Sequence, residues 1–139
     1  MSLQPDLPFE FNVPGTPVSL QGSPSSQEAW KERIRRLARA ALPEGAWLVE
    51  GRLEVTIFLF PAGQMQGDID NCAKPILDAL GKVVYFDDRQ IDRLVIQRFE
   101  PFVPCQVLDP SRKLIETIGS ERPVVYIRID EEPNRERAL

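Results

Sequence analysis

The segment 52–60, RLEVTIFLF, constrains the fold more than any other part of the sequence. It first alternates polar and apolar residues and then becomes apolar throughout, with many β-branched and aromatic side chains. A short segment of this composition is typical of a strand covered on both faces. We therefore expect a strand here, near the centre of a sheet.

Helices and further strands are expected on either side of this segment. Ser25 with Glu28 forms a capping box that predicts the start of a helix whose apolar stripe runs from Trp30 to Ala41. A second helix is predicted over about 72–82, with Pro75 in its first turn or just past it. Strands are expected at 9–20, with a break at Pro14 and Gly15, and at 91–100 and 124–129, whereas 101–123 reads as an irregular connection.

The order of these elements predicts an α/β or α+β fold with one mixed sheet flanked by two main helices. We expect one domain over residues 1–139, with its core at about 8–130 and a charged tail at 131–139. No stretch approaches the roughly 20 apolar residues of a membrane span, and the N-terminus lacks the features of a signal peptide. We therefore expect a cytoplasmic protein without a membrane partner.

Histidine is absent from the sequence. This excludes Ser–His and Cys–His nucleophilic pairs and closed His/Cys zinc sites. Catalysis would then depend on carboxylates, on lysine, or on a hard metal ion held by oxygen. The net charge of −4 is not typical of a nucleic-acid-binding protein, although it allows a local basic face.

Six of the nine aspartates lie within 67–92, namely Asp68, Asp70, Asp78, Asp87, Asp88 and Asp92. The question is what neutralises their negative charges. In an extended chain, Asp68 and Asp70 would point to the same side, and Asp70 or Asn71 would cap the second helix. Asp88 can reach them only if the segment after Lys82 doubles back. If it does, three or four carboxylates converge, and a cation such as Mg²⁺ would neutralise them.

Each of these residues also has an ordinary structural interpretation. Asp70 can be a helix cap alone, the Asp-Asp pair a turn, and Asp78 part of a solvated helix face. Lys74 can make a surface pair with Asp70, and Asp92 can pair with a neighbouring arginine in the sheet. The start of an EF-hand loop is excluded, because alanine stands at the glycine position and the closing glutamate is missing.

The ordered string is more specific than its parts: Asp68-x-Asp70-Asn71, Lys74, Asp78-Ala79-Leu80, then Asp87-Asp88 and a strand rich in Ile and Val. This string resembles the RusA family of Holliday junction resolvases, which are small endodeoxyribonucleases. NVPGTPVS near the start and VVYIRI near the end resemble the first and last strands of the family. The resemblance spans about 8–130.

The resemblance implies an α/β homodimer that uses Mg²⁺ to cut four-way junction DNA in recombination and repair. It places the metal ligands at Asp68, Asp70 and Asp88, where the metal would activate water for in-line attack on phosphorus. It places an essential lysine at Lys74, which would stabilise charge on the phosphate or orient the water. Asp87 and Asn71 would be accessory residues.

The sequence departs from the family after the first strand, where members commonly carry basic residues and VSLQGSPSSQ is uncharged. Junction affinity depends largely on phosphate neutralisation, so this departure is consistent with a weaker or altered DNA-binding surface, in which other cations replace them. The candidates are Lys31, Arg35 and Arg39 on the first helix, together with Arg89 and Arg93. The alternative for the helix cations is an ordinary solvated face.

Two other functions stay open. The chain could be a DNA-binding or structural relative that does not cut, although its carboxylate set is complete. It could also be a metal-dependent phosphohydrolase of small nucleotides, but the sequence shows neither a glycine cradle nor a basic pocket for phosphates.

Overall fold

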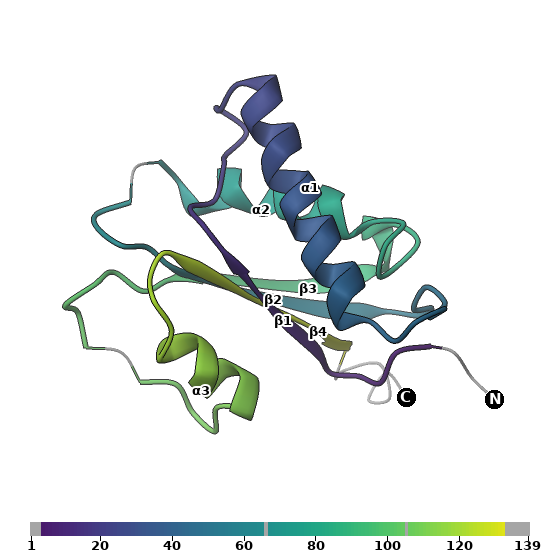
Figure 1. Cartoon of the computed structure of the whole chain (residues 1–139). Coiled ribbons are helices and arrows are strands. Elements are labelled where there is room, and N and C mark those ends of the chain that lie inside the picture. The colour runs from purple at the N-terminus through teal and green to yellow at the C-terminus, as the bar shows by residue number, and fades with distance from the viewer. Residues whose placement is uncertain (1–3, 66, 105, 133–139) are drawn as a thin grey trace.

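The computed structural model describes residues 4–65, 67–104 and 106–132. Its elements in chain order are β1 (Phe9–Pro14), α1 (Pro24–Ala41), β2 (Leu53–Phe60), α2 (Ile69–Leu80), a short 3-10 turn η1 (Asp88–Gln90), β3 (Ile91–Arg98), α3 (Arg112–Ile118) and β4 (Val124–Glu131). Helices α1 and α2 lie on one face of a single sheet, and α3 lies on the other (Figure 1). None of the helices in these described ranges has the length and apolarity that crossing a membrane requires.

The sheet is mixed, with the strand order β1-β4-β2-β3. Strand β2 is an interior strand, as its apolar sequence predicts. It runs antiparallel to β4 and parallel to β3. Parallel neighbours need a crossover, which α2 supplies between β2 and β3. The predicted α+β class with one mixed sheet is confirmed.

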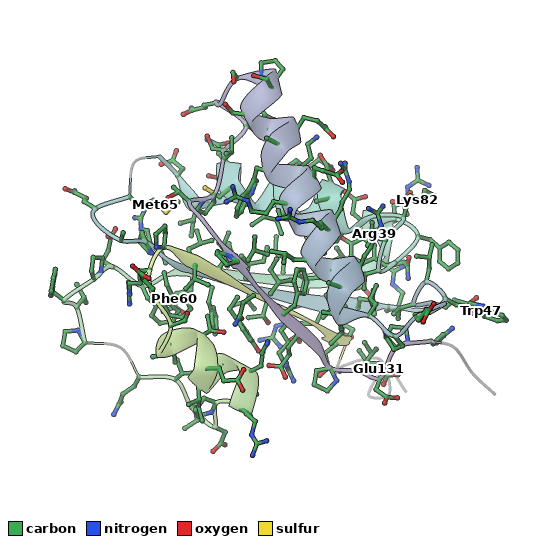
Figure 2. The ribbon with its side chains drawn as sticks, in the orientation of Figure 1. Arg39, Trp47, Phe60, Met65, Lys82 and Glu131 are labelled. Carbon is green, nitrogen blue, oxygen red and sulfur yellow. The ribbon has the colours of Figure 1, made fainter. Side chains whose placement is uncertain are left out.

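One face of the sheet packs against α3, a helix within the segment 101–123, for which the prediction of an irregular connection is wrong. Phe60 of β2, labelled in Figure 2, and Tyr126 of β4 share a small apolar cluster with Leu114 of α3. The helix begins after Ser111, whose hydroxyl accepts the N–H of Leu114 at 3.1 Å. With seven residues, the helix is too short to show an apolar period among the surrounding prolines.

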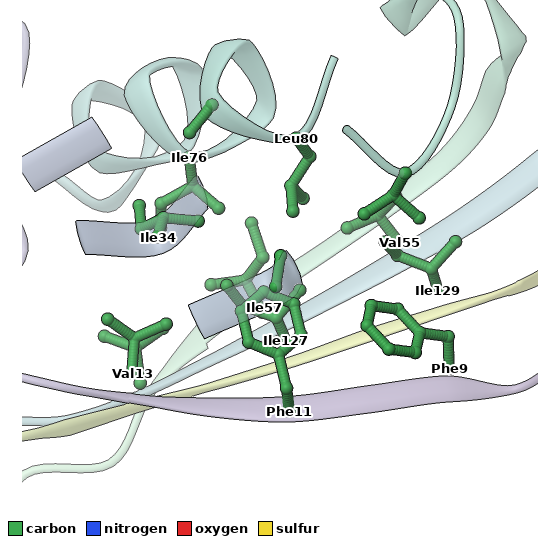
Figure 3. Close-up of a cluster of buried hydrophobic side chains, with 14 of the residues drawn as sticks. Phe9, Phe11, Val13, Ile34, Val55, Ile57, Ile76, Leu80, Ile127 and Ile129 are labelled. Atoms are coloured by element: carbon green, nitrogen blue, oxygen red, sulfur yellow. The ribbon is translucent and has the colours of Figure 1, made fainter. Parts of the chain in front are cut away.

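The other face carries the main core, in which α1 and α2 pack against the central strands (Figure 3). Ile57 of β2 and Ile127 of β4 meet Ile34 of α1, and all three are fully buried. Ile76 and Leu80 of α2 are also fully buried. Burial of each such side chain contributes about 1.5–3 kcal/mol. This packing fixes which side of α2 faces solvent.

Two helix starts differ from the sequence prediction. Ser23, not Ser25, caps α1: its hydroxyl accepts the N–H of Ser26 at 3.1 Å, and Pro24 occupies the first helical position that proline favours. Helix α2 begins at Ile69 with Asp68 as its N-cap, three residues earlier than predicted, so neither Asp70 nor Asn71 is the cap.

Pro75 lies well inside α2, not within or just past its first turn as predicted. Proline has no N–H to donate to the carbonyl four residues earlier, which here is that of Asn71. The N–H of Leu20 donates to this carbonyl at 3.0 Å. The helix therefore accommodates an interior proline because the loop after β1 takes over the hydrogen bond, and this loop becomes attached to the start of α2.

Candidate active site

The solvent face of α2 carries three charged residues at helical spacing: Asp70, Lys74 and Asp78 are all exposed. Residues four apart on a helix share one face. The buried Ile76 and Leu80 hold the opposite face against the sheet. The core therefore presents Asp70, Lys74 and Asp78 together to solvent.

The segment after α2 doubles back, as the convergence of aspartates requires. Gln90 holds it in place. Its side-chain carbonyl accepts the N–H groups of Phe86 and Asp87, and its amide group donates to the carbonyls of Val49 and Gly51. One side chain thus closes the turn and attaches it to the chain before β2.

Tyr85 anchors the same segment to α2. Its ring is fully buried, and its hydroxyl donates to the carbonyl of Leu77 at 2.9 Å. Burial raises the pKa of the Tyr85 hydroxyl, and the charge of Asp88 adds to this shift. The hydroxyl therefore stays neutral and keeps its role as a donor.

Asp88 reaches α2 at Lys74. The Lys74 Nζ lies 3.1 Å from Asp88 Oδ2 and 2.8 Å from Asp78 Oδ1. Hydrogen bonds to Asp78 and then to Asp88 raise the pKa of Lys74. Lys74 pairs with these two aspartates and not with Asp70, the partner considered from the sequence.

Asp68 and Asp70 lie at the N-terminus of α2, where the helix dipole favours negative charge. Gly67 before them has a φ of 86°, a conformation that glycine adopts without strain. The Asp68 side chain makes no capping bond, and Asp70 Oδ1 accepts the N–H of Asn71 at 3.0 Å. The Asp68 carboxylate is therefore not used to complete the helix.

Arg98 also lies in this region, although it is not among the site residues predicted from the sequence. Its Nη1 donates to the carbonyl of Gly67 at 3.3 Å, and its Nε pairs with Glu100 at 3.1 Å. It ends β3, and the carboxyl ends of two parallel strands meet at one edge of a sheet. Only a prediction that β2 pairs with β3 could have indicated that Arg98 lies near the start of α2.

The accessory residues have structural roles in this arrangement. Asp87 caps η1 by accepting the N–H of Arg89, and this bond, followed by one with Asp88, lowers the pKa of Asp87. Asn71 offers its backbone carbonyl to Leu20. Asp92 accepts from Arg52 Nε at 2.8 Å, which confirms the expected pair with a neighbouring arginine.

The five cations named as DNA contacts fall into two groups. Lys31 and Arg35 pair with glutamates of their own helix, and Arg93 pairs with Glu54 at 3.7 Å. The side chains of Arg39 and Arg89 are exposed and make no hydrogen bond or ion pair with the part of the chain that the structure describes.

The donor chemistry at this site fits a hard divalent cation, because Asp68, Asp70 and Asp88 offer only carboxylate oxygens. Within 4–65, 67–104 and 106–132, however, no three His, Cys, Asp or Glu side chains lie close enough to hold a metal ion together. Asp88 forms an ion pair with Lys74, which also pairs with Asp78. The three-carboxylate metal site thus stays a prediction.

A family model described as Endodeoxyribonuclease RusA matches residues 20–130 of this chain. This match indicates that the chain is an endodeoxyribonuclease. The chain belongs to the RusA family, whose members are Holliday junction endonucleases. No curated protein matches the sequence.

Proposed function

We propose that the chain is a Mg²⁺-dependent endodeoxyribonuclease that resolves four-way DNA junctions by paired phosphodiester hydrolysis. It acts in DNA recombination and repair, in the cytoplasm. The observation that carries the proposal is the return of Asp88 to Lys74, on the helix that bears Asp70, inside the segment matched to RusA. Two symmetric cuts need two sites, so the working form is a homodimer with one site in each protomer.

Asp68, Asp70 and Asp88 are the residues that would hold the metal. Bound Mg²⁺ would supply charge neutralisation at the phosphate and activation of water. A cation held by Asp88 competes with Lys74 for this carboxylate. Lys74 would then keep Asp78, 2.8 Å away, as the partner that positions it.

Lys74 acts through its positive charge. Its hydrogen bonds to Asp78 and Asp88 raise its pKa, so the side chain is an ammonium ion at neutral pH. A general base must be unprotonated near the working pH. Lys74 therefore stabilises the charge that develops on the phosphate and does not take a proton from water.

The remaining predicted residues support this site. Asp87 holds the turn that carries Asp88, and Asn71 holds the loop after β1 against α2. Lys31, Arg35, Arg39, Arg89 and Arg93 would contact DNA phosphates. Arg39 and Arg89 can bind phosphate directly, because neither forms an ion pair with the described residues.

One assay distinguishes this function from its alternatives. A labelled synthetic four-way junction, a linear duplex and a nucleotide are each incubated with the protein in Mg²⁺ or in EDTA, beside an Asp70→Asn variant. Paired symmetric nicks at the junction that disappear in EDTA and in the variant support the proposal. Binding without cutting by both proteins indicates a non-cleaving relative, and cleavage of the nucleotide alone indicates a phosphohydrolase.

A further inference from the structure

The cations that lack partners are unevenly distributed over the molecule. Most Lys and Arg side chains in the described part bond to a carboxylate or a carbonyl. Five do not: Arg36, Arg39, Lys82, Arg89 and Arg112. Four of them belong to the second half of α1 and to the segment between α2 and β3. Only Arg112 lies on α3, on the opposite face of the sheet (Figure 1).

Arg39 and Lys82 line one hollow, of about 300 Å³, where the end of α1 faces the chain after α2. The rest of its lining is made by residues 42–46, which include the carboxylate of Glu44, and by Leu48 and Val83. Lys82 has a φ of 68°, in the left-handed region that few residues other than glycine adopt. Its N–H donates to the carbonyl of Tyr85 at 2.7 Å, which holds this conformation.

Trp47 lies at the same end of the molecule as Arg39 and Lys82 (Figure 2). Trp47 is 65% exposed, whereas Trp30 is 3% exposed. Leaving a tryptophan in water forgoes the stabilisation that its burial would contribute. Aromatic side chains beside basic residues are the usual platform for nucleic-acid strands, because bases stack on the ring while phosphates bind the cations.

This hollow adjoins the candidate active site. The N–H of Val49 donates to the carbonyl of Val84 at 2.7 Å, so the segment that carries Trp47 is bonded to the segment that leads to Asp88.

We propose that Arg39, Lys82 and Trp47 form a second DNA-binding site, separate from the carboxylates, that takes the phosphate backbone of one strand of a junction arm. Arg39 and Lys82 bind phosphates, and the indole of Trp47 packs against a sugar or an exposed base of the same strand. The inference rests on the proposed function and extends it, since it explains how a chain of net charge −4 holds DNA.

Binding without cleavage tests the two cations. Fluorescence anisotropy of a labelled four-way junction is measured in EDTA over a series of salt concentrations. Arg39→Gln and Lys82→Gln each weaken binding about 3- to 10-fold and lower the slope of log affinity against log salt by about 1. The control is Arg112→Gln, which removes an unpaired cation from the opposite face of the sheet. It leaves both the affinity and the slope unchanged. Unchanged affinity and slope in both hollow variants overturn the inference.

Fluorescence tests Trp47 separately. The sequence has two tryptophans, and the other one, Trp30, is buried. Junction DNA quenches the emission of the unmodified protein, and Trp47→Phe removes this quenching while circular dichroism shows an unchanged fold. Quenching that persists in Trp47→Phe, or an accessibility of Trp47 to acrylamide that DNA does not change, contradicts the site.

Cleavage separates failure of this inference from failure of the function. Arg39→Gln and Lys82→Gln cut the junction at the normal kcat with a raised KM, because neither residue belongs to the carboxylate site. If the unmodified chain cuts junctions and the hollow variants bind as well as it does, the second site is wrong and the function stands. If the unmodified chain neither binds nor cuts a junction, both are wrong.

Discussion

Lys74 Nζ lies 3.1 Å from Asp88 Oδ2, which joins the middle of α2 to a turn fourteen residues further along the chain. The Lys74 side chain is 50% exposed, and such exposed pairs typically contribute at most about 1 kcal/mol to stability. The fold therefore does not depend on this contact. Gln90 and Tyr85 hold the turn in place, and the contact shows that the turn lies against the face of α2 that carries Asp70.

Replacement of Lys74 separates its catalytic role from its structural one. Lys74→Gln lowers junction cleavage about 100-fold or more, because it removes charge stabilisation at the phosphate. The free energy of unfolding, measured with urea, changes by less than about 1 kcal/mol, as expected for an exposed ion pair. Lys113→Gln breaks a comparable pair with Glu116 on α3 and serves as the control that changes neither measurement. Full cleavage by Lys74→Gln contradicts the role assigned to the ammonium.

Metal binding is measurable without DNA. Isothermal titration of Mg²⁺ into the unmodified chain shows binding that Asp68→Asn weakens about 10-fold or more, because one carboxylate ligand is lost. Asp92→Asn removes the same charge from the same part of the sequence, but its carboxylate is held by Arg52, so it leaves the titration unchanged. Equal Mg²⁺ affinity in the Asp68 and Asp92 variants shows that Asp68 is no ligand.

The sequence predicted the elements whose signals are local and strong. The apolar run of β2 placed it correctly inside the sheet, and the helical period from Trp30 placed α1. The features that were predicted wrongly depend on residues that are distant in the sequence. Pro75 appeared to forbid a helix that starts at Ile69, because nothing local shows that Leu20 satisfies the freed carbonyl of Asn71.

The candidate site was predictable in the same uneven way. The spacing of Asp68, Asp70 and Lys74 is visible in the sequence because Asp68 is the N-cap of α2 and the other two lie in the first half of that helix. The return of Asp88 to α2 could be stated from the sequence only as a condition. It depends on hydrogen bonds made by Gln90 and by the buried Tyr85. Arg98 was missed because strand pairing, not sequence proximity, brings it to Gly67.

Leucine substitutions test the packing that orients α2. Leu80 is fully buried, whereas Leu94 on the edge strand β3 is 40% exposed. Leu80→Ala destabilises the fold by about 2–5 kcal/mol, because it leaves a cavity between α2 and the sheet. Leu94→Ala costs less than about 1 kcal/mol. Chemical denaturation measures both, and similar losses in the two variants argue against the observed packing.

The Arg52–Asp92 pair makes the fold sensitive to acid. The bond from Arg52 lowers the pKa of Asp92 below its ordinary value of 3.8. A carboxylate with a depressed folded pKa stabilises the fold above its unfolded pKa, and this contribution is lost as the pH falls through the folded value. Urea midpoints measured at about pH 6 and at about pH 3 therefore differ less in Asp92→Asn than in the unmodified chain.

The control for this pH effect is Asp109→Asn. Asp109 has no hydrogen bond or ion pair within the described ranges, and asparagine suits its φ of 47°. This variant keeps the pH response of the unmodified chain. An Asp92→Asn variant with an equally large response means that the pair does not contribute to acid sensitivity.

The proposed function assigns Asp88, and not merely any carboxylate beside Lys74, to the catalytic site. Asp78 and Asp88 both pair with the ammonium group of Lys74. Asp78→Asn and Asp88→Asn therefore each remove one negative charge beside the same cation. The direct measurement is the rate at which each variant cuts a labelled four-way junction in Mg²⁺. We expect Asp88→Asn to lower the cleavage rate at least about 100-fold, whereas Asp78→Asn stays within about 10-fold of the unmodified rate. Equal rates in the two variants, or a larger loss in Asp78→Asn, would contradict it.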